Sequence, residues 1–424
     1  MPPPPSEQQI LALADRALEI AGPSAQVTAF WELRMQIDPT PGAQATMGVE
    51  FVCLERGIGR SSTSDVNDAG LRTAADLARR VAGADVGAAG AEPRSSELPP
   101  PSPGRVHAGW DPAVLALDPE RISEELAARA GELGFRWRGG AARTAVVSST
   151  GVRAFEQRSF VSLTLLGTSA GRSVTASVAA VGPAALDVDG ALARIAALTS
   201  AEPVASSIPR GEPAVVLGPA AVAVVLDLVR PDFGSGAITG DSAVAERLGR
   251  RVVAPCINLS DSPRFPGTLP RSYDAEGLPR QPLPLVQDGV AHRVVRDTAT
   301  PGGPSTGHAT VALRAAPAPL HLVLVGGGAA DEDELMRPIE RGVFIPALTP
   351  DGSRALGAFA IVDGLQAQPL PDAAVEVDGI GVLAGAQALS MSQQLVPTAD
   401  TSPRNVGASM CPALRASGGV TFRG

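Results

Sequence analysis

The sequence predicts an α+β fold with two domains: an N-terminal α/β sandwich-like domain, in which helices pack on an antiparallel sheet, and a C-terminal β-dominated domain. Helical and strand patterns alternate over roughly the first 200 residues, which is typical of a sheet covered on one face. A polar, proline-containing connector, "SAEPVASSIPRGEP", then precedes one further helix and a series of short apolar runs between Gly and Pro turns. We therefore place the N-terminal domain at 6–205 and the C-terminal domain at 206–424.

The first elements follow from hydrophobic spacing. Four prolines predict a disordered tail at 1–5, and apolar residues then recur at helical spacing from Glu7 to Ala21, where Gly22-Pro23 ends the helix. Strands are expected in "AQVTAFWELRMQI" and "ATMGVEFVCLERG", followed by an amphipathic helix in "AGLRTAADLARRVAG". This order predicts an antiparallel sheet with helices on one side.

The rest of the N-terminal domain continues the pattern after a loop. Residues 86–105 lack periodicity and are rich in Pro, Gly and Ser, which favours a loop. A third helix begins with Asp118 as its N-cap and Pro119 in its first turn. Alternating strands are expected around 145–149, 160–166 and 174–181, and a fourth helix near 188–198.

The C-terminal domain contains a long proline-rich segment, 262–289, "SPRFPGTLPRSYDAEGLPRQPLPLVQDG". Proline fixes φ and reduces the entropy lost on ordering, so an extended segment can stay in place with few ladder hydrogen bonds. We expect it to be ordered and held by its prolines against the C-terminal domain. Asp288-Gly289 should form a turn between two strands.

Composition limits the partners and the compartment. The net charge is −9, without a basic cluster, which argues against nucleic acid. The most apolar run, 213–229, is interrupted by Asp227 and is shorter than the roughly 20 residues of a membrane span. The start of the chain does not resemble a signal peptide. Three widely spaced cysteines indicate free thiols in a reducing compartment, so we expect a cytoplasmic protein without a membrane partner.

The residues contain no complete catalytic set. None of the four histidines (His107, His292, His308 and His321) has another within five residues, so no metal site is predicted. No Gly-x-Ser-x-Gly elbow is present, and Cys256 lies among apolar residues, which favours a structural thiol. We therefore predict no catalytic residue and no cofactor in this chain.

Three stretches resemble the TldD/PmbA (TldD/TldE) family. They are "YDAEGLP" at Tyr273–Pro279, "VQDGV" at Val286–Val290 and "GGPSTGHA" at Gly302–Ala309. In that family the metal-bearing subunit carries His-Glu-x-x-x-His on a helix after a "VVL.P" strand, and a cysteine near the C-terminus, to hold zinc. Here "VVLDLVRPDFGSGAITG" contains no histidine, although Cys411 lies near the place of the cysteine. The chain is thus similar to the TldE/PmbA-like branch that lacks the motif.

The resemblance implies a function. The chain would be the non-metal subunit of a heterodimeric TldD/TldE-type peptidase that processes small peptides or peptide-derived intermediates, and a TldD-like partner would supply the zinc. The chain would then shape the substrate cavity and would not be catalytic alone. Substrate or interface candidates are Asp274, Glu276, Ser305, Thr306 and His308. Two alternatives stay open: a diverged stand-alone enzyme of specialised metabolism that uses non-zinc chemistry, and a scaffold protein.

Overall fold

The computed structural model describes residues 3–38, 40–84, 98–102, 104, 109–169, 171–199, 210–300, 302–310, 316–398 and 402–423. The predicted boundary at 205/206 and most of the predicted loop at 86–105 lie outside these residues, so the domain limits stay predictions. The predicted disordered tail at 1–5 is described from Pro3. Its Pro5 carbonyl accepts a hydrogen bond of 2.6 Å from Arg143 Nη1, so this part of the tail is held on the sheet rather than loose.

The N-terminal half forms a six-stranded antiparallel sheet in the order β3-β2-β1-β4-β5-β6. Its elements are α1 (Glu7–Ala21), β1 (Ala25–Ile37), β2 (Pro41–Leu54), β3 (Ile58–Thr63), α2 (Asp68–Ala84), η1 (Pro112–Ala116), α3 (Pro119–Ala130), β4 (Gly134–Ser148), β5 (Arg153–Ser169), β6 (Arg172–Ala180), η2 (Pro183–Ala185) and α4 (Val188–Thr199). The predicted helices are confirmed; α1 has the expected bounds and begins with a capping box between Ser6 and Gln9. The mixed α+β class is confirmed as well.

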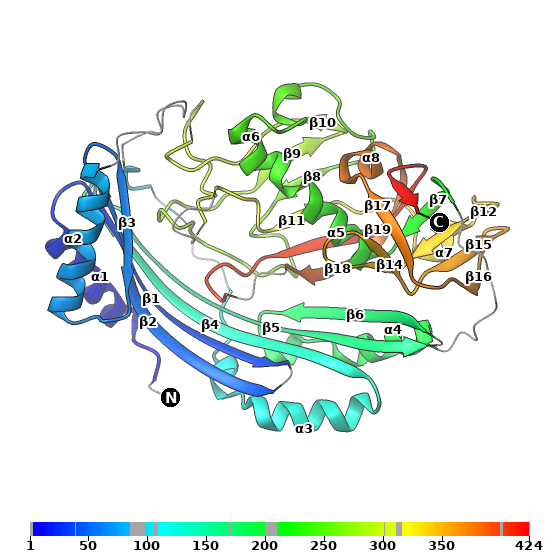
Figure 1. The fold of residues 1–424 in the computed structure, drawn as a ribbon, viewed down its shortest axis with the longest axis horizontal. Coiled ribbons are helices and arrows are strands. Elements are labelled where there is room, and N and C mark those ends of the chain that lie inside the picture. The colour runs from blue at the N-terminus through cyan, green and yellow to red at the C-terminus, as the bar shows by residue number, and fades with distance from the viewer. Residues whose placement is uncertain are drawn as a thin grey trace.

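The two faces of this sheet have different neighbours. Successive strand residues point to opposite faces, and in β5 Val161, Leu163 and Leu165 are fully buried in the core that contains the four helices. Phe160 points the other way and packs against C-terminal residues. Figure 1 shows the result: the sheet is curved, the helices lie on its outer side, and the C-terminal half occupies the concave side.

The strand prediction was too short for β4, which starts at Gly134 where we expected a strand only near 145–149. In its first half Arg136 and Arg138 occupy the face that meets the C-terminal half. Apolar and polar residues alternate over 135–138, but Gly139 and Gly140 interrupt the alternation, and glycine is depleted in strands, so the pattern is too short to be recognised.

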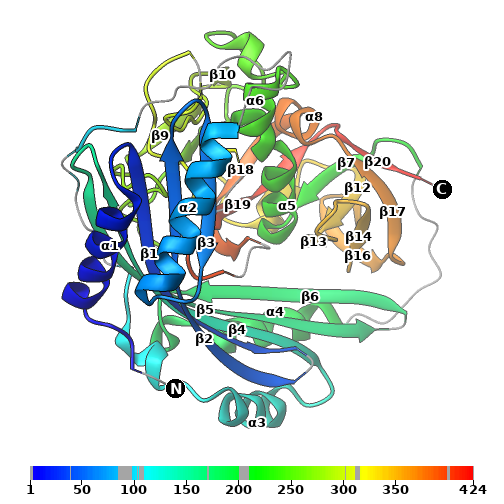
Figure 2. The same ribbon diagram turned by 60° about the vertical axis from the view of Figure 1, so that its left-hand side comes forward.

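The C-terminal half is rich in strands, as expected, and its main sheet follows the order β10-β9-β8-β11-β19-β7-β12-β15-β16, with β18 paired to β19. A second sheet has the order β13-β14-β17-β20. The β11–β19 and β7–β12 pairs are parallel and the other pairs are antiparallel. Figure 2 shows α5 between this sheet and the N-terminal one.

The elements of this half are β7 (Ala214–Leu217), α5 (Pro219–Val229), η3 (Arg230–Phe233), α6 (Ser235–Thr239), η4 (Ala245–Arg247), β8 (Leu259–Asp261), β9 (Leu283–Gln287), β10 (Val290–Ala291), β11 (Leu322–Leu324), α7 (Glu332–Met336), β12 (Arg341–Ile345), β13 (Ala347–Leu348), β14 (Arg354–Leu356), β15 (Phe359–Val362), β16 (Leu365–Pro369), β17 (Ala373–Val377), α8 (Gly379–Ala384), β18 (Ala386–Pro397), β19 (Ala408–Ala416) and β20 (Val420–Phe422). Among the described residues, no helix combines the length and the hydropathy that a bilayer crossing requires.

The segment 262–289 is ordered, and the predicted turn is confirmed: Asp288 and Gly289 have φ of 48° and 76° and join β9 to β10. The segment is attached to the C-terminal half, where Ser262 N donates to His321 O at 2.8 Å, and it also contacts the N-terminal sheet. Ser272 N donates to Glu156 of β5, Gln26 Nε2 donates to Ala275 O at 3.1 Å, and Arg158 Nε donates to Pro270 O at 3.4 Å. The segment therefore connects the two halves, because its backbone groups find polar partners on the N-terminal sheet.

We expect Gly289→Ala to destabilise the protein more than Gly249→Ala. Both glycines have positive φ, 76° and 77°. A Cβ at 289 would lie 2.5 Å from the carbonyl oxygen of Val253, whereas a Cβ at 249 would have nothing within 4 Å. The control should cost about 1–2 kcal/mol for backbone strain alone, and Gly289→Ala at least about 1 kcal/mol more because main-chain atoms must move. Denaturant unfolding measures both, and equal losses would contradict the crowding.

Candidate functional site

A cavity of about 450 Å³ lies between the two halves. Its floor is the concave face of the N-terminal sheet, where Arg136 and Arg138 of β4 lie beside hydroxyl residues of β5 and β6. Its roof includes α5, and β13, β18 and β19 complete the walls. The volume falls within the range of about 300–1,000 Å³ that is usual for ligand sites.

Strand register explains the polar floor. Arg138 lies opposite Ser162 and Arg136 lies opposite Thr164 in the β4–β5 pair. Thr164 in turn lies opposite Ser177, and their hydroxyl oxygens are 3.0 Å apart. Because alternate residues share a face, these polar side chains form rows on the cavity side while their neighbours fill the core.

Helix α5 supplies the roof through one of its faces. Ala220, Ala223, Val224 and Asp227 recur at helical spacing and line the cavity. The opposite face, with Val222 and Leu226, is fully buried in the C-terminal core. The roof is thus apolar along most of its length and carries one acidic group near the end of the helix.

The end of α5 does not fit a zinc ion. Asp227 forms an ion pair with Arg230, whose Nη1 also donates to Pro319 O at 2.6 Å. Burial, and then Asp227, raise the pKa of the Cys411 thiol, so it stays protonated, whereas zinc binds thiolate. In the described ranges no group of three or more His, Cys, Asp and Glu side chains could hold a metal.

The five predicted site residues are brought together elsewhere, around the segment 262–289. Asp274 is buried, and its carboxylate accepts hydrogen bonds from Glu276 N and Leu278 N at 2.9 Å and from Ala309 N at 3.0 Å. Glu276 accepts from the backbone N–H and the hydroxyl of Thr298 at 3.0 and 2.7 Å. The two carboxylates therefore fix the turn and attach it to neighbouring loops.

The remaining three residues belong to the same cluster. The hydroxyls of Ser305 and Thr306 donate to Arg296 O at 3.2 and 3.1 Å. His308 Nδ1 lies 2.8 Å from Thr306 O, and its Nε2 lies 3.4 Å from Asp261. None of the five predicted site residues lines the 450 Å³ cavity. Their hydrogen-bond partners are mainly backbone groups. A role of these residues in substrate binding or at an interface stays a prediction.

Sequence reasoning missed the centre of this cluster, the pair of Asp261 and Arg280. Both side chains are completely buried, and Arg280 Nη2 lies 3.0 Å from each carboxylate oxygen. Burial alone would raise the pKa of Asp261, but Arg280 and His308 outweigh it and hold this pKa well below its usual range. Burial, and then Arg280, lower the pKa of His321, which therefore stays neutral. No sequence signal joins residues so far apart along the chain.

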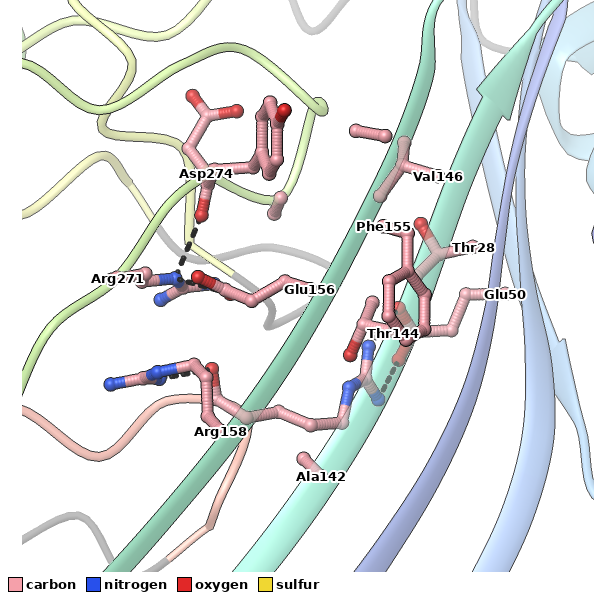
Figure 3. A pocket seen from close by; sticks show the side chains of 14 residues that line it. Thr28, Glu50, Ala142, Thr144, Val146, Phe155, Glu156, Arg158, Arg271 and Asp274 are labelled. Carbon is pink, nitrogen blue, oxygen red and sulfur yellow. Dashed lines mark hydrogen bonds and ion pairs between the residues drawn. The ribbon is translucent and has the colours of Figure 1, made fainter. Parts of the chain in front are cut away.

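A second charged region connects the segment to the sheet (Figure 3). Glu156 and Arg158 of β5 point toward Arg271 and the turn at Asp274. The gap here is only about 20 Å³, room for about one water molecule. Arg404 also donates to both carboxylate oxygens of Glu50 at 2.8 Å. These charges join the two halves and leave no space for a substrate.

We expect Glu276→Gln to stabilise the protein only at higher pH. Burial, and then Asp274, raise the pKa of Glu276 to about 8, against roughly 4.3 in an unfolded chain. The native state then holds the extra proton, so wild-type stability falls as pH rises from about 4.5 to 8. Melting curves should show a variant advantage that grows over this window. The exposed Glu246→Gln control should show a constant offset, and a constant offset for Glu276→Gln would contradict the shifted titration.

Comparison with known proteins agrees with this architecture. Residues 210–419 match the model of the PmbA/TldA metallopeptidase C-terminal domain. A metalloprotease from Methanothermobacter thermautotrophicus is 28% identical over 195 residues, which cover 39% of this chain and 42% of that protein. The chain thus aligns with less than half the length of this curated relative.

Solved structures share the whole fold. TldE from Thermococcus kodakarensis superimposes with a TM-score of 0.79 at 18% identity, over 97% of this chain and 99% of that one. A proposed modulator of DNA gyrase from Thermotoga maritima gives 0.79 at 16% identity, over 97% and 99% of the two chains. A similar protein from Bacteroides thetaiotaomicron gives 0.76 at 16% identity, over 99% of both. With the match of its C-terminal half to the family model, this chain belongs to the PmbA/TldD metallopeptidase family.

Proposed function

We propose that this chain is the non-metal, TldE-like subunit of a cytoplasmic heterodimeric peptidase, and that it binds the peptide while a TldD-like partner holds the zinc. This proposal rests mainly on the side chains at the end of α5, which border a cavity but do not fit a metal ion. The helix borders a cavity of about 450 Å³, yet its acidic group is paired with Arg230 and the nearby thiol is protonated.

The cavity suits a peptide better than a purely apolar ligand. Its floor offers hydroxyl groups on β5 and β6, which can donate to and accept from peptide groups, and two arginines. Its roof offers small and branched apolar side chains from α5, which can cover a ligand and exclude water. On this chain, these groups would bind and orient the substrate; the zinc of the partner would polarise the peptide carbonyl and activate water.

The comparisons support the same proposal at a coarser level. A curated relative that is 28% identical over 195 residues is named a metalloprotease, and a protein named TldE shares the fold over almost its entire length. Both names are properties of those proteins. A TldD-like partner and the processing of peptides are the proposed parts for this chain.

The test compares the chain alone with the chain co-expressed with a TldD-like subunit that carries His-Glu-x-x-x-His. We expect the isolated chain to contain less than about 0.1 equivalent of zinc and to leave short peptides uncleaved. The co-purified complex should contain about one equivalent per heterodimer and cleave them. Elemental analysis and mass spectrometry of the peptide products measure both quantities.

Three outcomes would contradict the proposal in different ways. Stoichiometric zinc and cleavage by the isolated chain would make it a peptidase in its own right. A metal-free chain that converts a peptide-derived compound would favour a stand-alone enzyme. If the TldD-like subunit cleaves the peptides equally well with and without this chain, a scaffold role would be favoured.

A further inference from the structure

We propose that Arg138 binds the C-terminal carboxylate of a short peptide held in the cavity between β4–β6 and α5. This inference rests on the proposed function, because it names the part of the substrate that the same cavity recognises. Arg138 projects from the floor of the cavity, on the strand that also carries Arg136.

The two arginines differ in their partners. Arg136 Nε forms an ion pair with Asp38, just beyond the end of β1. Arg138 is partly buried and makes no hydrogen bond or ion pair with any residue in the described ranges. A guanidinium group that is partly removed from water and has no partner loses part of its free energy of hydration, and an anion can restore it. The fork of N–H donors fits a carboxylate with two parallel hydrogen bonds.

The electrostatic environment supports this assignment. Burial, and then the neighbouring Arg136, lower the pKa of Arg138, and Asp38 compensates only partly. Positive charge is therefore in excess at this place on the floor. A bound carboxylate would neutralise it, whereas a neutral amide would not.

The roof does not offset this positive charge. Asp227 lines the cavity from α5, but it is paired with Arg230 and adds little negative charge to the site. The unpaired charge in the cavity is therefore that of Arg138, which suits the anionic end of a peptide. Ser162, opposite Arg138 on β5, offers a hydroxyl beside the carboxylate position.

The experiment compares the tripeptide Ala-Leu-Ala with its C-terminal amide by isothermal titration calorimetry, on the purified chain and on its complex with the TldD-like subunit. We expect the free acid to bind at least about tenfold more tightly than the amide. Arg138→Gln should reduce this ratio to below about twofold, and Arg138→Lys should retain part of it. Arg121→Gln, an exposed position on α3, is the matched control and should keep the ratio.

Each outcome decides the assignment. Equal binding of acid and amide by the wild type, an unchanged ratio in Arg138→Gln, or no binding of either peptide in both preparations would overturn it. Melting curves identify a variant that fails to fold, in which case Arg138→Lys decides. Zinc and peptidase activity in the isolated chain would overturn the proposed subunit role instead, while the ratio of acid to amide binding would still report on Arg138.

Discussion

The arrangement of the two halves depends on the buried ion pair between Asp261 and Arg280. Asp261 ends β8, and Arg280 lies 19 residues later, so their contact closes the irregular part of the segment 262–289 into a loop. The middle of this loop contacts β5 through Ser272 and Pro270. Removing one charge would leave the other buried without a partner, at a cost of about 3–5 kcal/mol. The pair therefore fixes the position of the loop, which is one of the contacts that fit the N-terminal sheet against the C-terminal half.

The arginines divide into two classes by their partners. The chain contains no lysine, so every basic side chain that could join the two halves is an arginine. Arg158 donates to the backbone carbonyl of Val406 at 2.8 Å, and Arg404 binds Glu50 with two hydrogen bonds. Their planar groups meet several acceptors at once, which suits a dry interface. Arg138 differs because it lies on a cavity wall and has no such partner among the described residues. The contrast separates arginines that hold the fold from one that is available to a ligand.

Short-range sequence patterns predicted the helices and one turn, but not the contacts between distant residues. The helices α1–α4 follow from apolar spacing and caps, and the turn at Asp288-Gly289 follows from two residues that tolerate positive φ. The first half of β4 was missed because Gly139 and Gly140 interrupt its alternation of apolar and polar residues after four positions. The Asp261–Arg280–His321 cluster was missed because its members meet only in the folded chain. Likewise the candidates Asp274 and Glu276 were found by resemblance, but their hydrogen bonds to backbone groups could not be read from the sequence.

In this fold the ligand cavity can exist without a metal site, and the side chains at the end of α5 explain why. A zinc ion would itself favour the thiolate form of Cys411, yet the ion would also have to release Asp227 from Arg230. The described part of the chain offers no further ligand group there. A zinc ion would therefore break the Asp227–Arg230 ion pair and deprotonate Cys411 without gaining a complete coordination sphere. The floor of the cavity lies on a different sheet and needs neither residue. A chain with this architecture can therefore keep the groups that we propose to bind a peptide, Arg138 and the hydroxyl rows of β5 and β6, without metal ligands on the described residues of α5.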